Sequence, residues 1–196
     1  KHNKFYKNLE QVLSLKKVKF FQLRLKKEKE KNKIFAGKKI KKICKKYNVK
    51  FIINDEPQLA KKLNADGCHI GQSDMGVFNS KKILGKKKII GITCHNSKKL
   101  ALEAKKNGAS YIAFGAFFNS LTKKTVYKAN LALLRWAKNK INIPIVAIGG
   151  INSSNYRNIM FNGANFIACS SYIWSNKKLS PIEAINAFDK KNENIG

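Results

Sequence analysis

Residues 50–74 read KFIINDEPQLAKKLNADGCHIGQSD, and they contain the pattern that decides the fold. Two short apolar runs, at 50–54 and 67–71, each end in polar residues, and an amphipathic segment separates them. An order of strand, helix and strand predicts a parallel βαβ unit. Because both runs are almost continuously apolar, we expect both faces of the sheet to be covered.

The same alternation runs through most of the chain. Short β-branched or aromatic runs are each followed by a longer amphipathic segment, which again favours parallel βαβ units. The predicted strands are residues 19–24, 50–54, 67–71, 89–93, 111–115, 145–149 and 165–169. The predicted helices include residues 8–16, 35–47, 97–107, 130–140 and 153–162.

Two folds fit this alternation, an open doubly wound sheet and a (β/α)₈ barrel. A doubly wound sheet concentrates function at a single switch point, whereas a barrel spreads it over all the carboxyl ends of its strands. Polar or glycine residues follow nearly every predicted strand, which favours an α/β protein with the (β/α)₈ TIM-barrel fold. These strand-end residues are Arg24, Asn54, Asp55, Gly71, Gln72, Thr93, Gly115, Gly149, Gly150, Ser170 and Ser171.

One strand of the predicted barrel is missing. The helix-like stretch 8–16 directly precedes the first visible strand, so only seven strands are predicted. Seven strands cannot close an eight-stranded barrel without leaving two unpaired edges. We therefore predict that residues 1–196 form a single (β/α)₈-barrel domain that is N-terminally truncated and lacks its first strand. A naturally open barrel is the alternative.

Composition narrows the classes of protein. The 43% hydrophobic content excludes a disordered chain, and no apolar run reaches the roughly 18 residues that span a membrane. The net charge of +30 suggests nucleic acid, but the lysines are spread over almost every predicted helix. We predict a cytoplasmic protein with no membrane or nucleic-acid partner and a preference for small anions. Its four cysteines form no Cys-x-x-Cys pair, which predicts reduced, mostly buried thiols.

Two of the four aspartates follow predicted strand ends. Asp55 and Asp74 lie after consecutive strands, so both carboxylates are expected above the same barrel mouth. Carboxylate oxygens beside a phosphate are typical Mg²⁺ ligands, which makes the pair a candidate metal site. The alternative is that Asp55 caps the helix beginning near Pro57 and that Asp74 caps the next helix. Asp66 is interpreted as a turn residue.

Three polar side chains alternate along the end of the first predicted strand. Gln22, Arg24 and Lys26 share one face because side chains repeat every second residue. If that face is the barrel interior, the guanidinium of Arg24 is buried in the mouth and needs an anion, such as a diphosphate. The alternative for Lys26 is that it starts the lysine-rich loop 26–33.

The loop after the fifth predicted strand carries two hydroxyls and one ammonium group. Ser120, Thr122 and Lys123 lie within four residues of sequence and form a candidate phosphate clamp. Hydroxyl groups are common in loops, so this pattern alone is weakly specific. It gains weight only from its position after a predicted barrel strand.

The last two strand ends suit a phosphomonoester. Gly149 and Gly150 leave backbone amides open to a ligand, and Ser170 and Ser171 follow the next strand. The loops after the last two strands form the usual phosphate site of a barrel. The alternative is that the two glycines serve only a tight turn.

Together these residues resemble the thiamine-phosphate synthase family, in which synthases and thiazole tautomerases share one fold. The resemblance extends from about residue 19 to residue 173, and its motifs occur in the right order. The segment at 65–75, ADGCHIGQSDM, is the most specific of them. The other matching segments are 22–26, 53–55, 91–93, 115–123 and 147–151.

The resemblance implies a reaction. It joins 4-amino-5-hydroxymethyl-2-methylpyrimidine diphosphate to 4-methyl-5-(2-phosphoethyl)thiazole, with a pyrimidine-methyl cation formed as diphosphate leaves. Arg24, Lys26 and Lys123 would be catalytic, and Asp55 and Asp74 would hold Mg²⁺. The implied substrate-binding residues are Gln22, Arg24, Lys26, Asn54, Thr93, Ser120, Thr122, Lys123, Gly150, Ser170 and Ser171.

The chain departs from the family pattern at a few positions. Thr93 stands where serine is usual, and Ser120 where threonine is usual, so both hydroxyls are kept. Asn119 replaces a usual proline and Leu25 a usual glutamate. The rival hypotheses are a tautomerase-like relative without synthase activity, a basic nucleic-acid-binding protein, and a phosphosugar-binding barrel. The retained cations and aspartates favour the synthase.

Overall fold

Seven parallel strands form one sheet in which each strand pairs with the next along the sequence. The structure, a computed structural model, describes residues 2–119 and 126–189. All seven predicted strands are present within those ranges. They are β1 (Phe20–Leu23), β2 (Lys50–Asn54), β3 (Gly67–Ile70), β4 (Ile89–His95), β5 (Tyr111–Phe114), β6 (Ile145–Ile148) and β7 (Phe166–Ala168).

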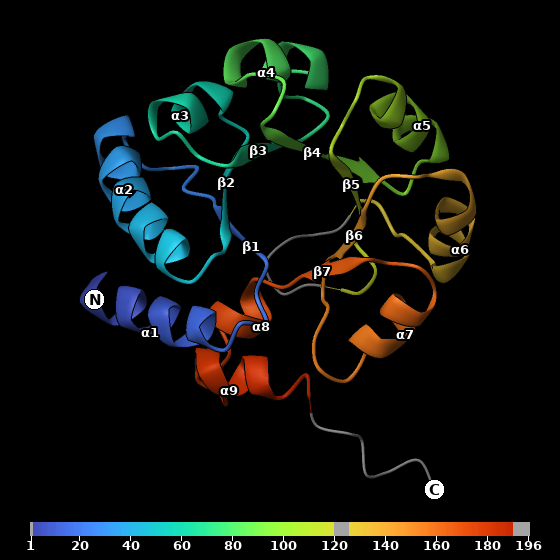
Figure 1. Cartoon of the computed structure of the whole chain (residues 1–196). Coiled ribbons are helices and arrows are strands. Elements are labelled where there is room, and N and C mark those ends of the chain that lie inside the picture. The colour runs from blue at the N-terminus through green and yellow to red at the C-terminus, as the bar shows by residue number, and fades with distance from the viewer. Residues whose placement is uncertain (1, 120–125, 190–196) are drawn as a thin grey trace, which may run out of the picture.

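Helices follow the strands and lie outside the sheet (Figure 1). The five predicted helices are present, with ends shifted by up to several residues. In the described ranges they are α1 (His2–Ser14), α2 (Glu30–Lys46), α3 (Pro57–Lys62), α4 (Val77–Leu84), α5 (Lys98–Lys106), α6 (Leu131–Lys140), α7 (Tyr156–Phe161), α8 (Ser171–Trp174) and α9 (Pro181–Asn186).

The sheet curls into a barrel that stays open between β1 and β7 (Figure 1). A doubly wound sheet reverses its strand order at one point, and the sequential order here excludes that fold. The structure therefore confirms the TIM-barrel prediction, with seven strands in the described residues. The Phe20 ring of β1 lies 6.4 Å from that of Tyr111 and 5.4 Å from that of Phe166, so β1 directs this face into the barrel.

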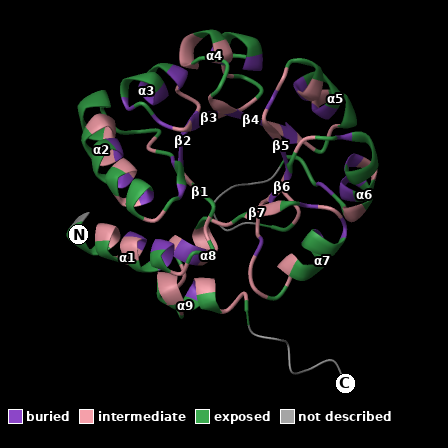
Figure 2. Cartoon of the chain, viewed as in Figure 1, coloured by how far each residue is buried: buried purple, intermediate pink, exposed green. Residues whose placement is uncertain are grey.

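The hydrophobic core lies between the sheet and the helices. Phe51, Cys68, Ile90, Ile112 and their neighbours along the strands are fully buried there, and buried positions mark the strands and the inward faces of the helices in Figure 2. Alternate strand residues face the barrel interior instead, which follows from the two-residue repeat of a strand. None of the helices in the ranges 2–119 and 126–189 has both the length and the apolar character needed to cross a membrane.

A glycine on β3 allows two strands to approach closely. A Cβ atom on Gly67 would overlap the backbone carbonyl of Ile89 on β4, which the parallel sheet holds in place. We expect Gly67→Ala to lower the free energy of unfolding by about 2–3 kcal/mol in denaturant titrations, since overpacking against backbone cannot relax easily. Gly76→Ala is the matched control, because a Cβ there meets open space; its cost should stay below about 1 kcal/mol. Equal losses would contradict the steric explanation.

Candidate active site

Two carboxyl groups from neighbouring strand ends come together. Asp55 directly follows β2, and its backbone N–H donates to the carbonyl of His69 on β3, at 2.7 Å. Burial raises the pKa of Asp55, but hydrogen bonding with the side chains of Lys26 and Asp74 outweighs it and leaves that pKa below its ordinary value. The Asp74 side chain therefore lies near enough to influence the protonation of Asp55, in keeping with two carboxyl groups at one mouth.

Helix capping does not explain either aspartate. The N-cap of α3 is Glu56 and that of α4 is Gly76, and neither helix receives a side-chain cap. Asp74 instead accepts a hydrogen bond of 2.7 Å from the backbone N–H of Gly71, inside its own loop. Asp55 has φ +64°, a left-handed conformation that Asp and Asn tolerate better than most residues. Both carboxyl groups are therefore held at the mouth, and the capping alternative is wrong.

The two cations after β1 are more exposed than expected. Gln22 and Arg24 are exposed, whereas Leu23 between them is buried, so the polar residues share one face. The Lys26 Nζ lies 3.0 Å from a carboxylate oxygen of Asp55, which joins the cations to the acidic pair. The prediction of a buried Arg24 is wrong, because β1 is an edge strand of the described sheet and only β2 covers it laterally.

A hydrogen-bonded chain of three side chains crosses the barrel interior. His69 of β3 lies between Tyr111 of β5 and Thr93 of β4: its Nδ1 is 2.8 Å from the Tyr111 hydroxyl and its Nε2 is 2.8 Å from the Thr93 hydroxyl. The rings of His69 and Tyr111 also stack at 5.5 Å. Burial lowers the pKa of His69 to about 4, an effect that the nearby Asp55 charge only partly opposes. The imidazole is therefore neutral at pH 7.

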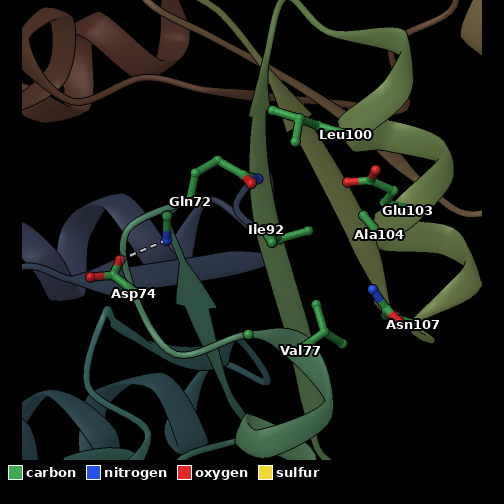
Figure 3. Close-up of a pocket in the computed structure, with 10 residues that line it drawn as sticks. Gln72, Asp74, Val77, Ile92, Leu100, Glu103, Ala104 and Asn107 are labelled. Carbon is green, nitrogen blue, oxygen red and sulfur yellow. Dashed lines mark hydrogen bonds between the residues drawn. The ribbon is translucent and has the colours of Figure 1, made fainter.

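Gln72 and Asp74 line a hollow of ≈ 150 Å³ between the β3–α4 loop and α5 (Figure 3). The Gln72 side chain extends toward β4 and donates a 2.5 Å hydrogen bond to the backbone carbonyl of Thr93. Glu103 and Asn107 line the opposite wall from α5. The hydrogen bond from Gln72 ties the loop that carries Asp74 to β4, and the hollow lies beside that loop.

The glycine pair after β6 packs against the loop after β5. Gly149 and Gly150 both have positive φ, +93° and +65°. A Cβ on Gly150 would come 2.7 Å from the carbonyl oxygen of Asn119, and the Gly149 carbonyl accepts a 3.0 Å hydrogen bond from the N–H of Phe118. Close packing of the two loops thus requires these glycines, in keeping with the tight-turn alternative. A role in ligand binding stays a prediction.

The remaining predicted residues divide into two groups. Asn54 is buried at the end of β2, while Ser170 and Ser171 lie at the start of α8, with Ser170 exposed. All three residues of the predicted phosphate clamp lie outside the described residues, so their placement stays a prediction. These are Ser120, Thr122 and Lys123.

The sequence analysis assigned no role to His69, Tyr111 or Gln72. The strand register shows why His69 and Tyr111 meet, because Asn54, His69, Gly91 and Tyr111 are successive partners across four strands and therefore face the same side. Which side chains become partners depends on strand register, which the sequence does not specify.

The fold and these strand ends define a class, the enzymes built on a TIM barrel with the active site at the carboxyl ends of the strands. Comparison with known proteins gives the family. A family model described as thiamine monophosphate synthase matches residues 1–173. The chain is 60% identical over 181 residues to the thiamine-phosphate synthase of Pelagibacter ubique strain HTCC1062, covering 92% of this chain and 87% of that one. The chain belongs to the thiamine monophosphate synthase family.

Further relatives agree with this assignment. The thiamine-phosphate synthase of Clostridium acetobutylicum is 39% identical over 179 residues, which cover 91% of this chain and 84% of that protein. Among solved structures, the thiamine phosphate pyrophosphorylase of Pyrococcus furiosus superimposes with a TM-score of 0.83 at 28% identity, covering 93% of this chain and 86% of that one. A 3-hexulose-6-phosphate synthase, at a TM-score of 0.65 and 15% identity, shares the fold alone.

The comparisons decide between the functional hypotheses. Curated relatives that cover most of the chain are thiamine-phosphate synthases, so the chain is an enzyme of thiamine biosynthesis, a transferase. They support the synthase rather than the tautomerase-like or nucleic-acid-binding alternative.

Proposed function

We propose that the chain condenses 4-amino-5-hydroxymethyl-2-methylpyrimidine diphosphate with 4-methyl-5-(2-phosphoethyl)thiazole, giving thiamine phosphate and diphosphate. The observation that carries this proposal is the Asp55–Asp74 pair beside Lys26 at the barrel mouth. Two carboxyl groups next to an ammonium group suit a diphosphate bound together with a divalent cation. The family relatives support the same reaction.

The donor set fits Mg²⁺. Asp55 and Asp74 present hard oxygen atoms, and Mg²⁺ is usually held by one or two carboxylates together with substrate phosphates and water. When bound, the ion neutralises charge that develops on a departing diphosphate. The described ranges hold no cluster of three or more His, Cys, Asp or Glu side chains suited to a metal, so we infer that substrate and water supply the other ligands.

The residues of the chain would bind and orient the substrates. Arg24 and Lys26 would bind the diphosphate from β1, with Gln22 beside them and Asn54 at the end of β2. Thr93 would contact the same substrate from β4. Departure of diphosphate needs charge stabilisation rather than a strong base, and preorganised cations provide it without rearrangement.

The thiazole phosphate would bind on the opposite side of the mouth. Backbone amides at Gly150 and the hydroxyls of Ser170 and Ser171 suit a phosphomonoester at the last two strand ends. From the loop after β5, Ser120 and Thr122 would contact the same phosphate and Lys123 the diphosphate. We also propose that the protein is cytoplasmic and binds these small molecules rather than nucleic acid.

Turnover with purified protein tests the proposal. We expect thiamine phosphate to form from the two substrates with Mg²⁺ and to stop on addition of EDTA. Excess Mg²⁺ should restore the rate, because EDTA acts only by removing the ion. Thiazole isomerisation without thiamine phosphate would refute the proposal and point to a tautomerase. A turnover rate that EDTA leaves unchanged would refute the metal assignment.

A further inference from the structure

The hydroxyl of Tyr111, whose pKa is raised above its ordinary value by burial, determines how the protons in the interior chain are arranged. Within the described residues the Tyr111 hydroxyl has one hydrogen-bond partner, the Nδ1 of His69. If the hydroxyl accepted a hydrogen bond from Nδ1–H, its own O–H would be left unsatisfied in the barrel interior, at a cost of about 1–3 kcal/mol. The Tyr111 hydroxyl therefore donates to Nδ1.

This donation fixes the other end of the imidazole. A ring that accepts at Nδ1 carries its proton on Nε2, and Nε2 lies 2.8 Å from the Thr93 hydroxyl. The Nε2–H thus donates to the Thr93 oxygen. A doubly protonated imidazole would donate there as well, so this direction does not depend on the charge of His69.

The Thr93 hydroxyl is left with one unused proton. Its oxygen accepts from His69, so its own O–H is available to donate. Thr93 is only half-buried, so a ligand in the barrel interior can reach it. We propose that Tyr111 and His69 are positioning residues that hold the Thr93 hydroxyl as a donor to an acceptor atom of the bound pyrimidine diphosphate. This inference rests on the proposed function.

The fold supports this arrangement at Gly91. A Cβ on Gly91 would overlap the ring of Tyr111, so the glycine makes the space in which that ring lies across β4. The register places Gly91 between His69 and Tyr111 across the sheet. The ring therefore reaches His69 over a strand that has no side chain in the way.

A double-mutant cycle tests whether Tyr111 acts through Thr93. We expect Tyr111→Phe to lower kcat/KM roughly tenfold, the equivalent of one net hydrogen bond, because His69 can then change tautomer. In the Thr93→Val background the same Tyr111→Phe change should have no further effect, whereas Thr93→Ser, which keeps the hydroxyl, should stay close to wild type. Tyr47→Phe, at the end of α2, is the control. Equal Tyr111→Phe losses in both backgrounds would overturn the inference.

The tautomer can also be measured without turnover. In ¹⁵N spectra of histidine-labelled protein, the signals of His69 are assigned as those that disappear in His69→Gln. We expect them to show the proton on Nε2. A ring protonated only on Nδ1 would overturn the inference. Failure of the wild-type protein to form thiamine phosphate would refute the proposed function, whereas the ¹⁵N result tests the proton arrangement alone.

Discussion

Replacing Asp55 by asparagine is expected to lower Mg²⁺-dependent turnover by roughly 10²–10³-fold, because it removes the negative charge that would bind Mg²⁺ beside the departing diphosphate. Asparagine is the better substitution than alanine, since residue 55 has φ +64° and Asn tolerates that conformation. The free energy of unfolding should therefore change little, and kcat should fall without loss of folded protein.

Asp189→Asn provides the matched control. Asp189 pairs on the surface with Lys17, which precedes the amino end of β1 and so lies at the opposite end of the barrel from the site. Its loss should leave kcat within about twofold, because exposed ion pairs contribute little. Titration calorimetry with Mg²⁺ and inorganic diphosphate gives a second readout, in which Asp55→Asn should weaken metal binding. Unchanged turnover in Asp55→Asn would refute the assignment of this carboxylate to the metal.

The strand pattern was predictable because its causes are local. Continuous apolar runs such as 50–54 and 111–115 must be buried on both faces, and amphipathic segments must cover them. The positions of Asp55 and Asp74 at neighbouring strand ends follow from that order alone. The short helices α8 and α9 were not predicted. The four residues of α8 are too few to show a helical period, whereas the capping box of Ser180 and Glu183, with Pro181 after the cap, is a sequence signal that could have revealed α9.

Other features depend on neighbours that a sequence does not reveal. The exposure of Arg24 is set by the absence of a strand beside β1 in the described sheet, rather than by the residue itself. The contact between His69 and Tyr111 depends on the strand register and on a missing side chain at Gly91. The assignment of residues 1–196 to a single, N-terminally truncated domain stays a prediction.

Arg24 is the residue whose loss should most weaken substrate binding. Within the described residues its guanidinium has no ion-pair partner, whereas Lys26, in the turn after β1, pairs with Asp55. An unpaired guanidinium at the carboxyl end of a strand can bind a phosphate through two parallel hydrogen bonds. We expect Arg24→Gln to lower kcat/KM for the pyrimidine diphosphate roughly 10- to 100-fold, as for a charge-assisted hydrogen bond.

A conservative variant and a surface control separate the effect of the charge of Arg24 from that of its planar shape. Arg24→Lys keeps the charge but loses the planar fork, so its kcat/KM should lie between those of wild type and Arg24→Gln. Arg135→Gln should change little, because Arg135 donates to Asn162 between α6 and α7, away from the strand ends. The KM for the thiazole phosphate should stay near wild type in Arg24→Gln, since that substrate is assigned to the last two strands. A selective rise in the KM for the thiazole phosphate would instead place Arg24 at that substrate's phosphate and would contradict the proposed assignment of the two substrates.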